Sequence, residues 1–393
     1  MHVSADFFTR NRQKLIAVLP KNSLVIIAGN GRMQRNSDSA YPFRQDSNFY
    51  YLTGIEEPCA TLIIDMRRKT SWVMLPLRIG VKAIFEGEID TKALQEQSGV
   101  DEVITEKEGW QRLKEYSQPI FMPLAPKAQL DDMFTNPHRA KVHKKARSLF
   151  GKPIDIRQQF ARIRSVKSPE ELAAITTAAQ ITFGAISTIE SALHSLTSEQ
   201  AVEAQLDQYF KMHGASGHAF SPIVASGAAS CMLHYEANNQ PITGDVLLLD
   251  IGAEVSNYAA DISRTLLLTD NQRVVSVHSA VATAQQEIIT LLKPGISWRD
   301  IAEAADNEVG KQLIKLGLLR KGFTRNQVRP YFPHAIGHFL GLDTHDVGVY
   351  EEPLQENMVI TVEPGIYLAD EGFGVRIEDD VVITRNGAKI LGI

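Results

Sequence analysis

The feature that most constrains the fold is an order of secondary structure that occurs twice in the second half of the chain. Each unit has two helices followed by strands that end in a hairpin. The helices are expected from Ser168 to about Leu193 and over 197–214, 271–294 and 297–317, and the hairpins over 246–268 and 359–384. Capping boxes are expected at Thr197 with Gln200 and at Ser297 with Asp300. The first helix has apolar residues at close to a 3.6-residue period, which is typical of a helix with one buried face. Two such units favour an α+β domain with pseudo-two-fold symmetry.

A helix start signal marks the beginning of this domain. Ser168 is expected as the N-cap, Pro169 takes the first helical position, and Glu171 stands three residues after the cap, which is the pattern of a capping box. We therefore predict one domain over 1–160 and another over 161–393. The first domain alternates strand-like and helix-like stretches, which favours a smaller α/β domain. Its strands are expected over 23–29, 60–66 and 71–77.

Both hairpins carry carboxylates among apolar residues. Asp250 and Asp261 flank the turn of the first hairpin, and Glu363 and Glu378 flank the turn of the second. A carboxylate in an apolar strand loses its hydration, at a large cost in free energy, unless a counter-ion or hydrogen-bond donors replace the water. Residues equidistant from a turn lie opposite each other with Cβ atoms about 5 Å apart, so each pair should converge. If the two hairpins pack together, four carboxylates meet and require a cation.

A histidine cluster lies in the stretch PHAIGHFLGLDTHDVG, which contains His334, His338 and His345. The first two have the spacing of the zincin motif HExxH, but Ala335 replaces the glutamate, so a zincin site is excluded. A lone histidine in an apolar stretch is more often a core residue, whereas three so close together favour a functional cluster. A histidine ligand beside several carboxylates suits Mn, Mg or two divalent ions held by a bridging carboxylate.

The composition excludes several classes of protein. The formal net charge is −5 and no block of basic residues occurs, so nucleic-acid binding is not expected. Cys59 and Cys231 are too few for a disulfide framework, which favours structural thiols in a reducing compartment. No apolar run approaches the ~20 residues of a membrane helix, and no signal-peptide pattern is present. We therefore predict a cytoplasmic protein that acts on small substrates and does not bind membranes.

Several stretches of the chain together resemble the pita-bread metallopeptidases. They are DIGAEVSNYAADISRT, HAIGHFLGLDTHDVG, VITVEPGIY and VRIEDDVVIT, and the set is similar to aminopeptidase P (Xaa-Pro aminopeptidase) and the related prolidases. The stretch NSDSAYPFRQDSNFYYLTGIEEP resembles the N-terminal domain of aminopeptidase P. The resemblance covers nearly the whole chain. It implies a C-terminal pita-bread domain with pseudo-two-fold symmetry and a smaller N-terminal α/β domain.

The resemblance also implies a site for two divalent metal ions, with Mn²⁺ as the usual ion of the family. Asp250 would bind one ion, Asp261 and Glu378 would bridge both, and His338 and Glu363 would bind the other. The implied reaction is hydrolysis of the bond between an N-terminal residue and a following proline. A hydroxide that bridges the two ions would attack the scissile carbonyl.

Other residues match family positions that act on the substrate or support the ligands. Glu363 is expected to shuttle the proton. His234, His334 and His345 match histidines that line the substrate site and stabilise the tetrahedral intermediate. Arg376, two residues before Glu378, matches an arginine that supports the ligands without touching metal.

Two aromatic residues are expected to contact the substrate. Phe85 aligns with a tryptophan that reaches into a neighbouring subunit's site in relatives, which favours a homo-oligomer, either a dimer or a tetramer. Phe339, with the adjacent Leu340, would supply an apolar wall for the proline ring. The loop that follows Tyr350, EEPLQENM, is shorter and more acidic than the arginine-bearing loop of longer relatives.

Three functions remain open on the sequence alone. The first is an aminopeptidase that acts on peptides with proline at position two. The second is a prolidase, which performs the same chemistry on dipeptides, although the N-terminal motif argues against it. The third is a non-enzymatic binding module on the pita-bread fold, which would be expected to lack metal ligands, whereas all five are present in this chain.

Overall fold

The computed structural model of the chain describes residues 4–124 and 135–393. It divides into two compact units, and the division falls between Ile163 and Arg164, within helix α7 (Arg157–Ser165). The boundary predicted after residue 160 lies close to this division.

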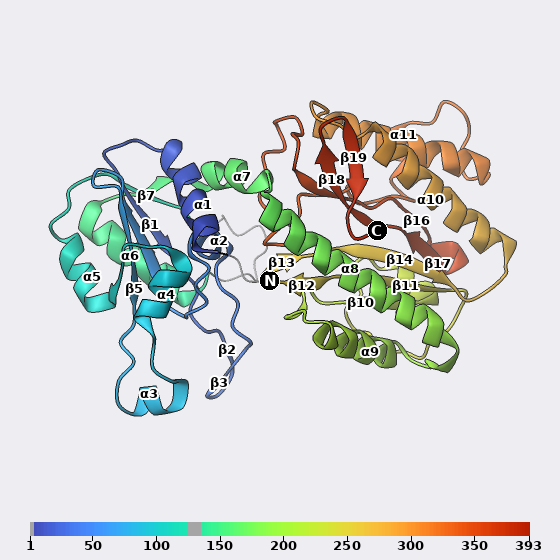
Figure 1. The fold of residues 1–393 in the computed structure, drawn as a ribbon. Coiled ribbons are helices and arrows are strands. Elements are labelled where there is room, and N and C mark those ends of the chain that lie inside the picture. Colours follow the sequence, from blue (N-terminus) through green and yellow to red (C-terminus); the bar gives the residue numbers. More distant parts are fainter. Residues whose placement is uncertain (1–3, 125–134) are drawn as a thin grey trace. The chain divides into compact units, whose positions relative to one another are not determined.

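The N-terminal unit is built on one mixed sheet (Figure 1) with the strand order β6-β5-β4-β1-β7-β8. These strands are β1 (Leu24–Ala28), β4 (Thr61–Asp65), β5 (Thr70–Leu75), β6 (Glu102–Thr105), β7 (Ile120–Met122) and β8 (Ile154–Asp155). The pairs β1–β4 and β4–β5 are antiparallel, and the other pairs are parallel. Every residue of β1 and β4 is buried, as expected of central strands that are covered on both faces. A short hairpin of β2 (Gln34–Asn36) and β3 (Ser39–Ala40) lies outside this sheet.

Helices accompany this sheet. They are α1 (Ala5–Ala17), α2 (Ser47–Thr53), α3 (Val81–Glu86), α4 (Thr91–Ser98), α5 (Glu106–Leu113) and α6 (Pro137–Phe150). Local start signals explain several of them, because Asp46 caps α2 and Thr105 forms a capping box with Glu108 at α5. Trp110 and Leu113 of α5 pack with strand residues in one buried apolar cluster. The unit therefore has a core of its own.

The C-terminal unit contains two pairs of long helices. They are α8 (Pro169–Ala192) with α9 (Glu199–Met212), and α10 (Gln272–Leu291) with α11 (Trp298–Lys315), to which the short α12 (Arg325–Val328) is added. The capping boxes predicted at Ser168 and Ser297 are present. Helix α9 begins one residue later than expected, because Ser198 rather than Thr197 accepts the hydrogen bond from the Ala201 N–H.

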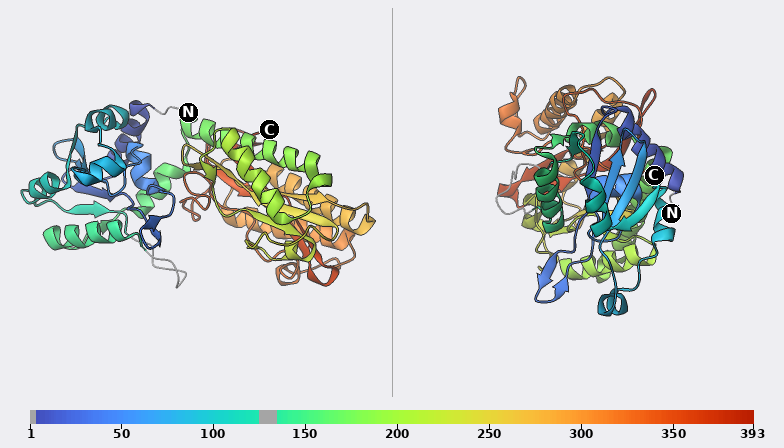
Figure 2. Two further views of the ribbon diagram at one scale, coloured as in Figure 1. Left: turned by 90° about the horizontal axis from the view of Figure 1, so that it is seen from below. Right: turned by 90° about the vertical axis from the view of Figure 1, so that its left-hand side faces the viewer.

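The strands of this unit lie between the two helix pairs (Figures 1 and 2). Their orders are β10-β11-β14, β13-β12-β9, β15-β18-β19 and β16-β17. The strands are β9 (Gly217–His218), β10 (Ile223–Ser226), β11 (Val246–Ile251), β12 (Ala253–Val255), β13 (Tyr258–Ala259), β14 (Ile262–Leu267), β15 (Val359–Val362), β16 (Gly365–Leu368), β17 (Phe373–Arg376), β18 (Asp379–Thr384) and β19 (Gly387–Ile390). Each long hairpin expected from the sequence is divided, so that its base and its tip belong to different sheets.

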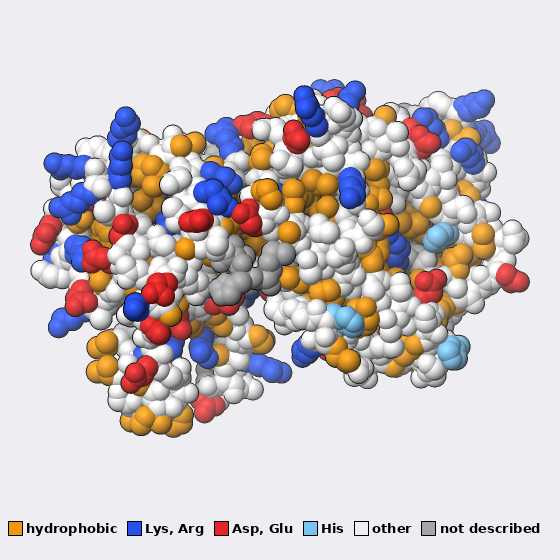
Figure 3. Space-filling model, viewed as in Figure 1, with side chains coloured by type: hydrophobic (Ala, Val, Ile, Leu, Met, Phe, Trp, Pro, Cys, Tyr) orange, Lys and Arg blue, Asp and Glu red, His pale blue; other side chains and the backbone are white. Residues whose placement is uncertain are grey.

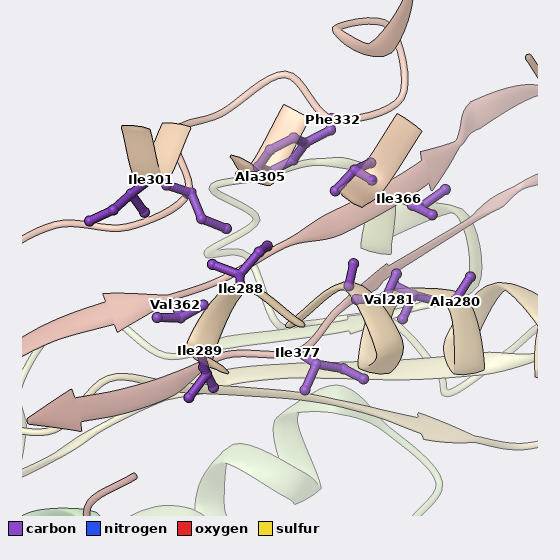
Figure 4. Close-up of a cluster of buried hydrophobic side chains, with 14 of the residues drawn as sticks. Ala280, Val281, Ile288, Ile289, Ile301, Ala305, Phe332, Val362, Ile366 and Ile377 are labelled. Carbon is purple, nitrogen blue, oxygen red and sulfur yellow. The ribbon is translucent and has the colours of Figure 1, made fainter. Parts of the chain in front are cut away.

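The core of the second repeat lies on α10. Figure 4 shows its side chains Ala280, Val281, Ile288 and Ile289 gathered with residues of α11 and of the neighbouring strands. The labelled partners are Ile301, Ala305, Phe332, Val362, Ile366 and Ile377. Burial of the valine, isoleucine and phenylalanine side chains among them, each worth about 1.5–3 kcal/mol in transfer free energy, stabilises the packing of the strands on α10.

Helix α8 is the one described helix whose length and composition would allow it to cross a membrane, over the window Pro169–Ser195 that includes the short 3-10 helix Leu193–Ser195. Half of that window is buried inside the protein, and α8 contacts β12, β13 and β14. A core helix of a soluble domain passes the same test, so this helix is weak support for a membrane segment.

Candidate metal centre

The four hairpin carboxylates lie where the strands pass from one sheet to another. Asp250 is near the end of β11, and Asp261 lies between β13 and β14. Glu363 lies between β15 and β16, and Glu378 lies between β17 and β18. At a break between two strands, the side chain does not have to follow the alternating directions of either sheet, so it can point toward the site. The two breaks in the first hairpin lie against each other. A Cβ atom added to Gly252, at the first break, would lie only 1.7 Å from the carbonyl oxygen of Ala260, at the second.

Hydrogen bonds between the two hairpins bring the carboxylates together. The backbone N–H of Glu378 donates to the Ser263 carbonyl at 3.0 Å, and that of Asp261 donates to the Asp380 carboxylate at 3.2 Å. The His338 carbonyl accepts from the Thr361 N–H at 2.9 Å, which places the histidine segment beside β15. The convergence predicted from the pseudo-two-fold pattern is therefore observed in the structure.

These side chains open into one pocket of about 320 Å³. Its lining includes all five residues proposed as metal ligands from the sequence, and also the three other site histidines. They are Asp250, Asp261, His338, Glu363 and Glu378, with His234, His334 and His345. Donor atoms of Asp261, His338 and Glu378 all lie within 4.8 Å of one another, which is close enough for one ion to reach all three.

Three carboxylates of this pocket, those of Asp261, Glu363 and Glu378, have pKa values above the ordinary range. Burial raises the pKa of Asp261 and Glu378 well above the usual carboxyl range, and neighbouring carboxylates raise each further. Burial raises the pKa of Glu363 to about 7, against a lowering by His338. The cluster is thus poorly neutralised by the protein itself, which is the situation that a bound cation relieves.

Asp250 is held by Arg376 through one oxygen only. The Arg376 guanidinium donates to Asp250 Oδ2 at 2.6 Å, and the other oxygen, Oδ1, is buried without a hydrogen-bond partner among the described residues. A buried carboxylate oxygen without a partner is costly. Its free lone pairs, aimed into the carboxylate pocket, fit a divalent cation.

Arg376, expected from the sequence to support the ligands without touching metal, contacts one carboxylate directly and another through a serine. Its direct ion pair is with Asp250, and its Nε donates to Ser263 Oγ at 2.9 Å. The Ser263 hydroxyl in turn donates to Glu378 Oε2 at 2.7 Å. The reason is the register of the hairpins, which interposes the strand residue Ser263 between the guanidinium and Glu378.

The imidazole of His338 has one nitrogen free for a ligand. Its Nδ1 lies 3.0 Å from the Phe339 carbonyl, which can only accept, so Nδ1 carries the proton. The Nε2 lone pair faces Asp261 Oδ2 at 3.4 Å and Glu363 Oε1 at 3.7 Å. A backbone carbonyl that fixes the tautomer in this way is the usual support of a metal-binding histidine.

His334 differs from the expectation that it donates to the substrate. Its Nδ1 lies 2.8 Å from the Ala335 carbonyl, and its Nε2 lies 2.8 Å from the Tyr367 hydroxyl. That hydroxyl accepts from Arg376 at 3.0 Å, so its own hydrogen is donated to Nε2. Burial lowers the pKa of His334 to about 4. His334 is therefore neutral with both nitrogens engaged inside the protein.

His345 and His234 remain available to a substrate. No hydrogen bond to either ring is recorded among the described residues, and both line the pocket. The ring of His345 lies edge-on to that of His338 at 4.3 Å. Burial lowers the pKa of His345, so at pH 7 it is a neutral ring that carries one N–H.

The two aromatic residues expected at the substrate lie outside this pocket lining. Phe339 is 1% exposed and packs against Trp298 and Tyr350, so its expected role as a substrate wall is wrong, because residues on alternate sides of an extended segment face opposite ways. Leu340 is also fully buried. Phe85 lies in α3 of the N-terminal unit and is 85% exposed. Figure 3 shows hydrophobic side chains gathered over α3, at the lower left.

Sequence reasoning missed two residues of the site. Ser263, which links Arg376 to Glu378, stands two residues after Asp261, so strand alternation placed it on the same face. Tyr367, which links Arg376 to His334, stands in VITVEPGIYL only four residues after Glu363. Burial and the Arg376 guanidinium act in opposite directions on its phenol, and burial prevails, raising the pKa of Tyr367 to about 12.

Comparison with known proteins places both units in families. Residues 173–385 match the model of metallopeptidase family M24, and residues 8–119 match that of the aminopeptidase P N-terminal domain. The chain is 32% identical to a protein named Xaa-Pro aminopeptidase from Escherichia coli, across 98% of this chain and 94% of that one. It is 30% identical to a mitochondrial intermediate cleaving peptidase 55 of Arabidopsis thaliana, across 99% and 80%.

A solved structure is similar over the same extent. Aminopeptidase P from Escherichia coli, described with the inhibitor Pro-Leu, superposes with a TM-score of 0.87 at 29% identity, covering 100% of this chain and 95% of that one. The carboxylate–histidine cluster of this chain lies within the part that matches the metallopeptidase model. The chain therefore belongs to metallopeptidase family M24, as a metal-dependent peptidase with an aminopeptidase P N-terminal domain.

Proposed function

We propose that this protein is an Xaa-Pro aminopeptidase that removes an N-terminal residue preceding proline. The observation that carries the proposal is the pocket in which four hairpin carboxylates and His338 converge beside two free histidines. The relatives named Xaa-Pro aminopeptidase support it, because they match across both units of the chain.

The donor set fits divalent metal ions. Four carboxylates and one imidazole suit Mn²⁺. Among the described residues the buried Oδ1 of Asp250 has no hydrogen-bond partner, and the unprotonated Nε2 of His338 faces the carboxylates of Asp261 and Glu363. We propose that Asp250, Asp261, His338, Glu363 and Glu378 hold two such ions, with Mn²⁺ as the physiological one. Bound divalent ions would polarise the scissile carbonyl and lower the pKa of a water molecule in the site.

The protein's own groups would handle the proton and the developing negative charge. We assign the proton to the Glu363 carboxylate, which lines the pocket beside His338 and can there accept a proton and pass it on. We assign the N–H of neutral His345 and that of His234 to the substrate carbonyl oxygen, where each would stabilise the oxyanion. His334 would not donate, because Tyr367 and Ala335 engage both of its nitrogens.

Proline specificity would come from an apolar part of the same pocket. Proline has no backbone N–H, so a site that recognises it needs an apolar surface for the ring rather than an acceptor. Phe220, Ile223 and Leu233 line the pocket and offer that surface, in place of the buried Phe339.

The test is a comparison of three substrates at one Mn²⁺ concentration. We expect kcat/KM for Ala-Pro-Ala to exceed that for Ala-Ala-Ala, and to be at least as high as that for Ala-Pro. Chelation should abolish hydrolysis, and added Mn²⁺ should restore it. Preference for the all-alanine peptide would contradict proline specificity. Hydrolysis of Ala-Pro alone would instead assign the protein to the prolidases.

We further propose a cytoplasmic homo-oligomer. Both cysteines are free, which suits a reducing compartment. The exposed apolar residues around α3 offer a surface that a second copy could cover. They are Leu77, Ile79, Val81, Ile84 and Phe85. Light scattering on the purified protein should give the mass of a dimer or tetramer, and a monomer would contradict this proposal. Fractionation of cells should recover the protein with cytoplasmic markers.

A further inference from the structure

The segment that carries His234 has no regular secondary structure of its own. It follows the 3-10 helix Gly227–Cys231, and residues 233–240 contain no helix or strand. Leu233, His234 and Glu236 line the pocket, whereas Tyr235 is 9% exposed and Asn238 is 3% exposed. The segment thus presents three side chains to the pocket and buries two others. Something other than a backbone ladder must hold His234 in place.

One buried carboxylate holds this segment. Glu199, in the first turn of α9, is fully buried. Its Oε2 accepts from the Tyr235 hydroxyl at 2.8 Å and from the Gln240 N–H at 3.0 Å. Its Oε1 accepts from both the N–H and the hydroxyl of Ser226, each at 3.0 Å. The Glu199 N–H also donates to the Gln240 carbonyl at 3.0 Å.

These contacts bracket His234 on both sides. Ser226 ends strand β10, Tyr235 follows His234 directly, and Gln240 closes the segment. Four groups donate to the Glu199 carboxylate: the N–H and hydroxyl of Ser226, the Tyr235 hydroxyl and the Gln240 N–H. A glutamine at position 199 would point its NH₂ group, which is itself a donor, at some of these donors. Because the hydrogen bonds are charge-assisted and buried, they fix the segment more firmly than exposed ones would.

We propose that Glu199 is a positioning residue for His234, acting through Tyr235 and Gln240. The proposal rests on the proposed function, in which His234 donates to the substrate carbonyl. Glu199 itself is not among the residues that line the pocket. Loss of its contact with Tyr235 leaves the fold intact but lets the His234 ring depart from its productive place.

The chain offers a matched pair of variants for the test. Tyr235→Phe removes one hydroxyl that donates to Glu199, at 2.8 Å. Tyr258→Phe removes a hydroxyl that donates to Glu171, 1% exposed in the first turn of α8, at 3.2 Å. Both changes delete the same atom from a buried tyrosine–glutamate pair, but Tyr258 is not part of the pocket lining.

The kinetic test is a double-mutant cycle with His234→Ala on Ala-Pro-Ala. We expect Tyr235→Phe to lower kcat/KM by about 10-fold, in the range typical of residues that orient a functional side chain. In the His234→Ala background the same change should have less than about a 2-fold effect, because it acts only through His234. Tyr258→Phe should be additive with His234→Ala. Equal losses from Tyr235→Phe in both backgrounds would overturn the proposal.

A second readout does not depend on activity. In histidine-labelled protein, the NMR signal of the His234 ring is identified by its absence from His234→Ala. Tyr235→Phe and Glu199→Gln should shift or broaden that signal, whereas Tyr258→Phe should leave it unchanged. An unchanged His234 signal in Tyr235→Phe would overturn the proposal even if the protein cleaved no Xaa-Pro peptide. A wild-type protein that is inactive on Ala-Pro-Ala would count against the proposed function alone.

Discussion

At the scale of single residues, the site depends on a relay from one guanidinium to several metal-facing groups. Arg376 contacts Asp250 and Tyr367 directly, and it contacts Glu378 through the Ser263 hydroxyl. The Arg376 guanidinium compensates part of the negative charge of the cluster and leaves the centre of the pocket to the proposed ions. Ligands and supporting residues should therefore differ in how strongly their loss affects metal binding.

Substitution of Arg376 and of His338 should separate these two roles. Arg376→Ala removes a side chain that supports the ligands but leaves all five proposed ligand residues, so the affinity for Mn²⁺ should fall by about 10 to 100-fold. His338→Ala removes a donor and should reduce the number of bound ions. Calorimetric titration of the metal-free proteins with Mn²⁺ measures both quantities. Ser263→Ala, which cuts only the link to Glu378, serves as the milder comparison. Equal stoichiometry and affinity in the Arg376 and His338 variants would contradict the assignment.

At the scale of elements, the loop that carries His345 is attached to the start of the C-terminal unit by buried charges. Asp346 Oδ2 accepts from Lys167 Nζ at 2.8 Å, and its Oδ1 accepts from the Arg164 guanidinium at 2.5 Å. All three side chains are no more than 2% exposed. The same loop approaches so closely that a Cβ on Gly341 would lie 2.1 Å from Asp346 Oδ2.

Removal of the Asp346 charge should destabilise this loop strongly. Asp346→Asn leaves Lys167 buried without its anion and takes one of two carboxylates from Arg164, and breaking a buried pair in this way costs about 3–5 kcal/mol. Chemical denaturation should report that loss in the unfolding free energy. Asp343→Asn is the matched control, because Asp343 bonds the same guanidinium at 2.8 Å but is 45% exposed. Its loss should cost about 1 kcal/mol or less. Similar losses in both variants would show that burial does not set the strength of this network.

At the scale of the whole molecule, the carboxylate cluster should make the stability of the fold depend on pH. Without metal the protein should lose stability as the pH rises, and with metal bound it should gain stability. Glu363 has its ordinary pKa, near 4.5, in the unfolded chain and a value of about 7 in the folded protein. The metal-free folded state therefore binds the proton more tightly than the unfolded state. This contribution is fully present below pH 4.5 and is lost as the pH rises through about 7.

Thermal unfolding of the wild type and of Glu363→Gln between pH 5 and 8 tests this linkage. In the presence of a chelator, the Tm of the wild type should fall relative to that of the variant as the pH rises. With Mn²⁺ added, the wild type should instead gain stability toward high pH, because the ion binds the deprotonated ligands. Parallel curves for both proteins under chelation would contradict the raised pKa of Glu363.

Much of the fold was determined by local sequence signals. The capping boxes at Ser168 and Ser297 and the 3.6-residue apolar period marked helices that the structure contains, because such signals act within one or two turns. The repeated order of helices and hairpins indicated the pseudo-two-fold, and apolar strands with isolated acids indicated a polar centre. Buried carboxylates need a partner wherever the chain folds, so these acids alone indicated a cation site, whereas the individual ligands were implied by the resemblance to the pita-bread metallopeptidases.

Only the tertiary structure decided which side chains face the pocket and which support it. Phe339 stands next to His338 in sequence, yet it is buried against Trp298 while the histidine faces the carboxylates. Ser263, Tyr367 and Glu199 act through partners from 33 to 115 residues away. Contacts of that separation depend on how the two hairpins and α9 pack, and no local period or spacing encodes that packing. The sequence by itself determined which acids would need a cation, because a buried carboxylate is costly in any fold, and the packing of distant elements determined which residues surround and support them.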